Sequence, residues 1–107
     1  MNKSLLVLAV LALVISTAPA QNPSPPISGV VSSRGRGPLG GVTISLVHPA
    51  IGRSAPTFSA PNGSYFFVNI PPQAQPYYIE AYWGSQLLFR DLLTYQGAPV
   101  RFNIPLP

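Results

Sequence analysis

The hydrophobic residues of this chain recur at every second position, and this spacing constrains the fold more than any other feature of the sequence. From residue 27 onward, apolar and polar side chains alternate in short runs, of which residues 100–107 are the clearest. A period of two places successive side chains on opposite faces of a β-strand, whereas a helix needs a period of 3.6. No long window beyond residue 20 has a helical stripe free of proline and glycine. The pattern therefore predicts an all-β domain.

Proline and glycine separate these runs, with 14 prolines and 9 glycines in 107 residues. The segment 60–63, Ala-Pro-Asn-Gly, has the residues of a type I turn followed by a left-handed glycine, which predicts a hairpin joining residues 57–59 to 65–68. Pro71 and Pro72 end the second of these strands, because proline has no N–H to donate to a ladder. The spacing of runs and turns predicts seven short strands, as in a β-sandwich.

The first 20 residues have the pattern of a secretory signal peptide. Lys3 and the amino terminus precede an unbroken apolar run over residues 5–15, which is shorter than the ~20 residues that span a bilayer. Residues 18–20, Ala-Pro-Ala, match a cleavage site, so we expect cleavage between Ala20 and Gln21. The protein would then be secreted to the periplasm, the cell surface or the medium, with no stable membrane span. A retained amino-terminal anchor is the alternative.

The rest of the chain divides into two parts. Residues 21–26 are rich in proline and predict an extended spacer. Residues 27–107 contain all the predicted strands. We therefore expect a signal peptide at 1–20, a spacer at 21–26 and a single β-domain at 27–107.

The composition leaves few groups for catalysis or metal binding, since the whole chain has no cysteine, one histidine and two carboxylates. Disulfides, thiolate zinc sites and cysteine nucleophiles are excluded, and calcium sites normally need several carboxylates. His48 and Asp91 match a catalytic triad in residue type alone, because no serine lies in a nucleophile-elbow motif. We predict no catalytic residue, no metal and no cofactor, and expect His48 to be a partly exposed turn residue.

The charge of the exported part is positive, with five arginines against Glu80 and Asp91. Arg34 and Arg36 alternate with glycine, as in some nucleic-acid-binding segments, but two arginines do not make a tract. Because the chain is expected to be secreted, we predict no nucleic-acid partner. We expect these arginines to form a solvated hairpin tip, and weak attraction to anionic glycans or lipid headgroups is the alternative.

Several short motifs follow one another in a fixed order along the β-domain. They are Ile27-x-Gly29-x-Val31, Gly37-Pro38-Leu39, Gly41-Val42-Thr43-Ile44-Ser45-Leu46, Asn62-Gly63-Ser64-Tyr65-x-Phe67 and Ile70-Pro71-Pro72. In this order they resemble the carboxypeptidase regulatory-like domain, over about residues 27–107. The resemblance implies a seven-stranded, transthyretin-like Greek-key β-sandwich that serves as a non-catalytic module of exported proteins. The chain departs from the family pattern after Pro72, where the loop is longer and lacks the usual glycine.

Aromatic residues gather in the segment 77–83, Tyr-Tyr-Ile-Glu-Ala-Tyr-Trp. Strand alternation and the family pattern direct its first, third and fifth residues to the core, which leaves Tyr78 and Tyr82 outside and Trp83 at the strand end. Exposed aromatic rings stack on sugars or anchor protein interfaces. The alternative is that they fill the outer sheet face beneath neighbouring side chains.

Two further residues extend this predicted surface. Phe66 is expected to point outward, and Arg90, flanked by Leu88 and Leu92 on one side of the next strand, is placed to stack on an aromatic ring. The candidate ligand or partner surface comprises Phe66, Tyr78, Tyr82, Trp83 and Arg90.

We therefore expect a secreted, non-catalytic β-sandwich module that acts in protein interaction or as an architectural element of the cell envelope. Its partner would be another exported protein or a second copy of the chain, held by the aromatic sheet face or by an exposed strand edge. The alternative is a carbohydrate-binding module that holds a polysaccharide with its exposed aromatics, an expectation that rests partly on likeness of fold.

Overall fold

A computed structural model describes residues 25–107, and this part of the chain forms ten β-strands and no helix, as the alternation predicts. The strands are β1 (Ile27–Ser33), β2 (Gly37–Pro38), β3 (Thr43–His48), β4 (Gly52–Arg53), β5 (Thr57–Phe58), β6 (Ser64–Phe67), β7 (Tyr77–Trp83), β8 (Gln86–Leu93), β9 (Val100–Arg101) and β10 (Ile104–Leu106). Four of them have two residues each, so they outnumber the seven predicted. The predicted signal peptide and its cleavage position lie outside the described residues. Within residues 25–107, no helix is long and apolar enough to cross a membrane.

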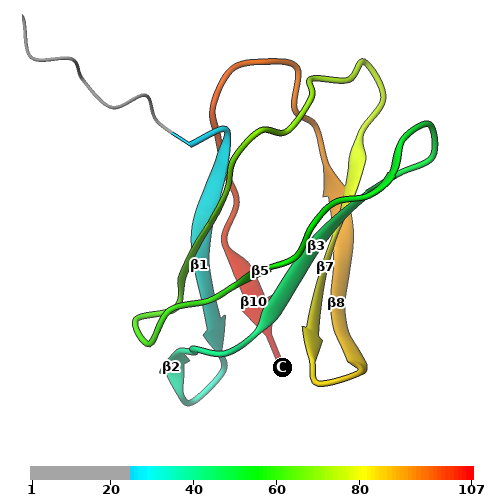
Figure 1. Cartoon of the computed structure of the whole chain (residues 1–107). Helices are drawn as coiled ribbons and strands as arrows, with labels where there is room; N and C mark the ends of the chain where they lie inside the picture. The colour runs from blue at the N-terminus through cyan, green and yellow to red at the C-terminus, as the bar shows by residue number, and fades with distance from the viewer. Residues whose placement is uncertain (1–24) are drawn as a thin grey trace, which may run out of the picture.

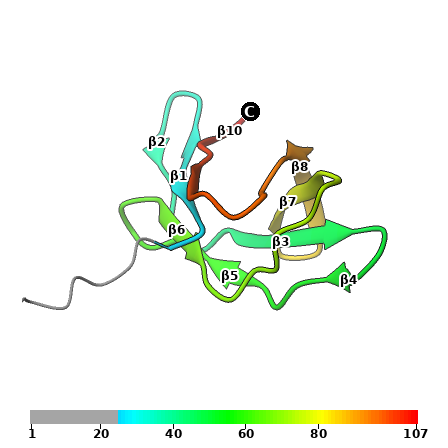
Figure 2. The same cartoon turned by 90° about the horizontal axis from the view of Figure 1, so that it is seen from above.

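The strands form two sheets that face each other (Figures 1 and 2). In the first sheet β1 is central, with β9 and β10 parallel to it along one edge and β6 and β2 antiparallel along the other. In the second sheet β4 and β5 pair with one edge of β3, and β7 and then β8 follow on its other side, all antiparallel. The molecule is therefore an all-β, two-sheet globule.

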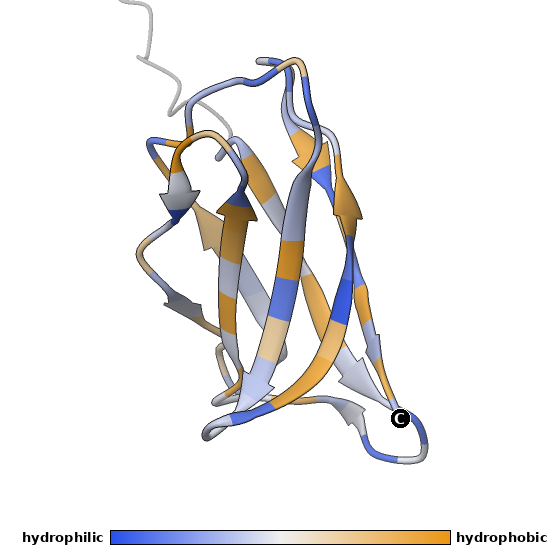
Figure 3. Cartoon of the chain, turned by 90° about the vertical axis from the view of Figure 1, so that its right-hand side faces the viewer, coloured by the Kyte–Doolittle hydropathy of each residue, from blue (hydrophilic) through white to orange (hydrophobic). Residues whose placement is uncertain are grey.

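The core lies between the sheets and follows the predicted alternation. Along β7 the first, third and fifth residues are buried and apolar, and Figure 3 shows apolar and polar residues alternating along the strands. The buried apolar residues are Ile27, Val31, Val42, Ile44, Leu46, Tyr65, Phe67, Tyr77, Ile79, Ala81, Leu93, Tyr95, Ile104 and Leu106. Removing these side chains from water is the main source of stability for a chain without disulfides.

The turn at residues 60–63 forms as predicted, but the hairpin does not. Gly63 has a φ of 83° and its N–H donates to the carbonyl of Ala60 at 2.7 Å. The strands on either side then diverge, because β5 pairs with β3 in the second sheet and β6 pairs with β1 in the first. The turn therefore carries the chain from one sheet to the other. The hairpin prediction was wrong because a local turn signal does not specify which strands pair across the sandwich.

The first strand approaches the carboxyl-terminal segment very closely. A Cβ built on Gly29 would lie 1.8 Å from the carbonyl oxygen of Phe102, so only glycine fits at this position. The hydroxyl of Tyr65 donates to the same carbonyl, and the Asn103 side chain accepts a hydrogen bond from the N–H of Val30 at 3.0 Å. These contacts interrupt the run predicted over residues 100–107, which the structure divides into β9 and β10.

Strand β8 lies at an edge of the second sheet and contains a β-bulge. Ala81 is opposite Phe89 and Tyr82 is opposite Leu87, so Leu88 is an extra residue on β8. Leu88 packs against the core while Leu87 is exposed. Leu88 therefore does not flank Arg90 on one side of the strand, as the alternation predicted, because the bulge reverses the side chains that precede it.

Candidate functional site

The outer face of the second sheet, which points away from β1, carries three cross-strand rows of side chains. The register aligns Arg53, Val47, Tyr78 and Leu92 in one row, Ser45, Glu80 and Arg90 in the next, and Phe58, Thr43, Tyr82 and Leu87 in the third. Side chains directly opposite each other on one face lie close enough to interact. The rows therefore bring residues from five strands, β3, β4, β5, β7 and β8, onto one surface, which we call the outer face.

Glu80 lies at the centre of the outer face and is buried there, with a side chain that is 7% exposed. Its Oε1 accepts hydrogen bonds from the guanidinium of Arg53 at 2.9 Å and from the hydroxyl of Tyr82 at 2.8 Å. Its Oε2 lies 3.4 Å from Nε of Arg90. A buried carboxylate is tolerated only when it is paired and hydrogen-bonded in this way.

The contacts of Glu80 keep it ionised. Burial alone would raise the pKa of this carboxyl, but the hydrogen bonds from Tyr82 and Arg53 and the charges of Arg53 and Arg90 outweigh it, so the pKa lies below its ordinary value. The hydrogen bond to Glu80 in turn raises the pKa of Arg53. Glu80 is therefore an anionic anchor that fixes two arginines in place.

Both tyrosines of the outer face are covered by arginine. The guanidinium carbon of Arg90 lies 4.2 Å from the centre of the Tyr78 ring, and that of Arg53 lies 6.0 Å from the centre of the Tyr82 ring. The predicted stacking of Arg90 on an aromatic ring is present. A cation therefore lies over one face of the Tyr78 ring and a second lies at the limit of contact with Tyr82, and these contacts restrain the side chains before any partner arrives.

The outer face has more exposed apolar area than the sequence indicated. Phe58 is 63% exposed, Leu92 52%, Leu87 45% and Tyr78 36%. Phe58 and Arg53 were not predicted to belong to this surface, because their two-residue strands have no alternation to detect and their place follows from pairing with β3. The register of neighbouring strands was the missing information.

The structure does not bring Phe66 and Trp83 together with Tyr78, Tyr82 and Arg90. Phe66 belongs to β6 of the first sheet, where it is 57% exposed beside an open apolar cleft of about 660 Å³. Trp83 is 52% exposed and lines a separate groove of about 330 Å³. The predicted surface residues therefore lie at three places, of which the outer face holds Tyr78, Tyr82 and Arg90.

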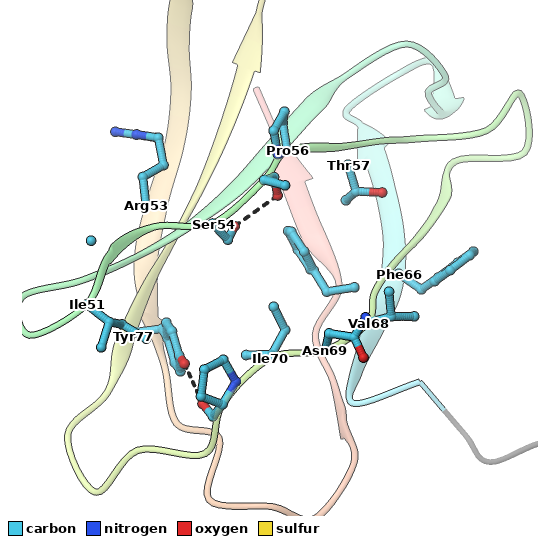
Figure 4. Close-up of a pocket in the computed structure, with 14 residues that line it drawn as sticks. Ile51, Arg53, Ser54, Pro56, Thr57, Phe66, Val68, Asn69, Ile70 and Tyr77 are labelled. Atoms are coloured by element: carbon cyan, nitrogen blue, oxygen red, sulfur yellow. Dashed lines mark hydrogen bonds between the residues drawn. The ribbon is translucent and has the colours of Figure 1, made fainter.

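The cleft beside Phe66 lies between the β4–β5 segment and the loop that follows β6. Figure 4 shows Ile51 and Tyr77 on one side of it and Phe66 and Val68 on the other. The Tyr77 hydroxyl donates to the carbonyl of Pro71, and burial raises the pKa of this hydroxyl. The lining is mainly apolar, and its polar side chains come from Arg53, Ser54, Thr57, Asn69 and Tyr77.

His48 is buried and structural, which corrects the prediction of a partly exposed turn residue. It is 2% exposed, and its ring packs edge-on against Tyr77 with a centroid distance of 5.0 Å. Nδ1 accepts a hydrogen bond from the N–H of Ala50, so Nε2 bears the proton and donates to the carbonyl of Gln75 at 3.2 Å. Both ring nitrogens are therefore bound to the backbone, and neither is directed at Asp91.

Comparison with models of known protein families found no match, and comparison with curated proteins found no similar chain. Within residues 25–107, no three side chains of histidine, aspartate or glutamate gather as metal ligands would.

Proposed function

We propose that this protein is an exported, non-catalytic β-sandwich module that binds another exported protein through the outer face. The observation that supports this most strongly is the ordered cluster of Tyr78, Tyr82, Arg53 and Arg90 around the buried carboxylate of Glu80. Tyrosine and arginine are the residues most enriched at the energetic centres of protein interfaces. The contacts of these side chains with Glu80 and with one another restrain them in the free protein, which lowers the entropy lost on binding.

The proposed partner presents a flat surface that carries carboxylates. Arg53 and Arg90 share one carboxylate, and their side chains are each 51% exposed, so the outer face has one uncompensated positive charge. Exposed Phe58, Leu87 and Leu92 surround the cluster and supply apolar area. Contacts that surround tyrosine and arginine anchors and exclude water from them are typical of interface hot spots. Sugar stacking fits this face less well, because a sugar would have to displace Arg90 from Tyr78.

We further propose that the two sheets form a transthyretin-like Greek-key sandwich of the carboxypeptidase regulatory-like type. The ordered motifs of the sequence support this, as does a central β1 paired with both the middle and the end of the chain. We propose export on the signal-like residues 1–20. Amino-terminal sequencing of the exported protein would test this, and a chain that begins at Gln21 is the expected result.

Two matched variants test the interaction. Leu92→Glu places a charge on the outer face, and Val68→Glu places the same charge on an equally exposed aliphatic residue beside the Phe66 cleft. The wild type and both variants are immobilised and incubated with the exported proteins of the source organism, and self-association is followed by sedimentation velocity. We expect Leu92→Glu, and not Val68→Glu, to lose the bound partner or the self-association. Equal behaviour of the two variants, or loss with Val68→Glu alone, would contradict the proposed interface.

A further inference from the structure

The Trp83 groove lies at the end of the sandwich where three segments meet. These are the β1–β2 turn, the β7–β8 turn and the end of β10, which approach one another at the lower end of Figure 1. The residues that matter for its chemistry are Arg34, Arg36, Trp83 and Gln86. Its volume of about 330 Å³ is at the small end of the range for ligand sites and has room for a short segment of a chain.

We propose that this groove binds an acidic polysaccharide, with the Trp83 indole stacked on a sugar ring and Arg34 and Arg36 bound to its carboxylate or sulfate groups. This goes beyond the proposed protein interaction and does not depend on it, since the groove and the outer face share no residue of their binding clusters.

The indole of Trp83 is presented as a supported platform. It is 52% exposed, and a Cβ on Gly41 would lie 3.8 Å from Cζ3 of the ring, so the backbone of that glycine runs beside the indole. Gly41 has a φ of 79°, which permits the turn that brings it there. A large flat apolar ring with a polar edge suits a sugar, which has an apolar face and a hydroxylated rim.

The two arginines at the groove differ from those of the outer face. Arg53 and Arg90 are paired with Glu80, whereas Arg34 and Arg36 have no carboxylate within 4 Å among the described residues. Their turn is fixed by backbone hydrogen bonds, in which the N–H of Arg34 donates to the carbonyl of Leu106 and that of Arg36 to the carbonyl of Ser33. Guanidinium groups bind carboxylate and sulfate through paired, charge-assisted hydrogen bonds.

A saccharide with acidic groups is the ligand that uses all these features together. The arginines supply charge, the indole supplies the stacking surface, and the amide of Gln86 can both donate to and accept from hydroxyls. A phosphate-bearing lipid headgroup would use the arginines but would leave the exposed indole without a ring to stack on. We therefore treat anionic membranes as an outcome of the test.

The test uses residues 21–107, because all ten strands lie within this range. The probes are polygalacturonate, dextran sulfate, uncharged dextran and vesicles of phosphatidylglycerol. Trp83 is the one tryptophan of the chain, so its fluorescence reports on the groove directly, and calorimetry measures the affinity of every variant. The variants are Arg34→Gln with Arg36→Gln, Trp83→Ala, and the control Arg101→Gln, which removes the charge of an exposed arginine on β9.

We expect the two acidic polysaccharides to shift the Trp83 fluorescence saturably and dextran to leave it unchanged. The double arginine variant and Trp83→Ala should each weaken binding by about tenfold or more, while Arg101→Gln and the outer-face variant Leu92→Glu bind as the wild type does. Equal weakening by Arg101→Gln would show diffuse charge attraction and overturn the proposal. Binding of dextran as tightly as dextran sulfate, or of vesicles in place of both polysaccharides, would also overturn it. Melting temperatures establish that each variant is folded.

Discussion

Glu80 lies directly opposite Arg90 in the β7–β8 register, and Nε of Arg90 is 3.4 Å from its Oε2, although Glu80 is on the outward side of its strand. The outward position is nevertheless buried, because Arg53, Arg90 and Tyr82 close over the carboxylate. One side chain thus fixes the geometry of the proposed interface.

Replacing this carboxylate should loosen the whole outer face. Glu80→Gln removes the negative charge shared by the two arginines and so weakens their charge-assisted hydrogen bonds. Because both arginines are half exposed, water screens this loss, and we expect the free energy of unfolding to fall by about 1–2 kcal/mol. Urea denaturation measures this change. Arg101→Gln, which alters an exposed arginine elsewhere, should change stability by much less; similar losses in both variants would contradict the anchoring role of Glu80.

The same carboxylate predicts sensitivity to acid. The pKa of Glu80 is lower in the folded protein than the ordinary value of 4.5. The stability that the ionised carboxylate contributes is therefore fully present above about pH 4.5 and is lost as the pH falls through the folded pKa. The wild type should therefore lose stability below pH 4.5 more steeply than Glu80→Gln does. Urea titrations of the two proteins at a series of pH values would measure this difference, and parallel curves would refute it.

The buried hydroxyl of Tyr65 predicts a loss of stability in alkali. Burial raises the pKa of this hydroxyl well above its ordinary value of 10.0, and the Arg101 charge lowers it only in part. Below about pH 10 the hydroxyl is protonated in both the folded and the unfolded protein, so its contribution to stability does not depend on pH. Above that pH the unfolded chain loses the proton first, so stability falls as the pH rises. Tyr65→Phe should reduce this slope, as measured by denaturant unfolding between pH 9 and 11, roughly one unit on either side of the ordinary pKa of tyrosine.

The close approach at Gly29 should make it intolerant of any side chain. Gly29→Ala would place a Cβ 1.8 Å from the Phe102 carbonyl oxygen and force β1 and the segment after β9 apart, with an expected loss of about 3 kcal/mol or more. Gly35→Ala is the control, since it meets no atom within 4 Å and should cost only about 1–2 kcal/mol for its φ of 82°. Thermal unfolding of the two variants compares these costs. Equal melting temperatures would contradict the close approach at Gly29.

Phe66 and Phe67 are neighbours with opposite environments. Phe67 is 4% exposed in the core and Phe66 is 57% exposed. We expect Phe67→Ala to lower the free energy of unfolding by about 3–5 kcal/mol and Phe66→Ala by less than about 1 kcal/mol. Chemical denaturation measures both losses. If the two losses were equal, the assignment of the sheet faces would be wrong.

The sequence was sufficient to predict which side chains of β7 face inward. Alternation placed Tyr77 and Tyr78 on opposite faces, the family pattern assigned Tyr77 to the core, and the residue types at 60–63 predicted the left-handed Gly63. These features are local, because strand geometry and turn conformation depend on adjacent residues.

Features that depend on distant partners could not be predicted in this way. His48 became buried because a loop 27 residues away supplies the carbonyl of Gln75, and Phe58 joined the outer face because β5 pairs with β3. The bulge at Leu88 changed one strand face without any glycine or proline to mark it. Each of these positions is decided by strand pairing, which alternation alone does not specify.

The parallel pairing of β1 with β9 and β10 also sets the order in which the protein can fold as it is made. The N–H of Val30 bonds to Asn103, 73 residues later, so the strand synthesised first in the domain waits for partners synthesised last. At translation rates of about 5–20 residues per second this delay is roughly 4–15 s. During that interval β3, β7 and β8 can already pair, while β1 lacks its neighbours on one edge. The nascent chain therefore remains incompletely folded until synthesis reaches Leu106. An incompletely folded polypeptide can still be threaded through a narrow channel.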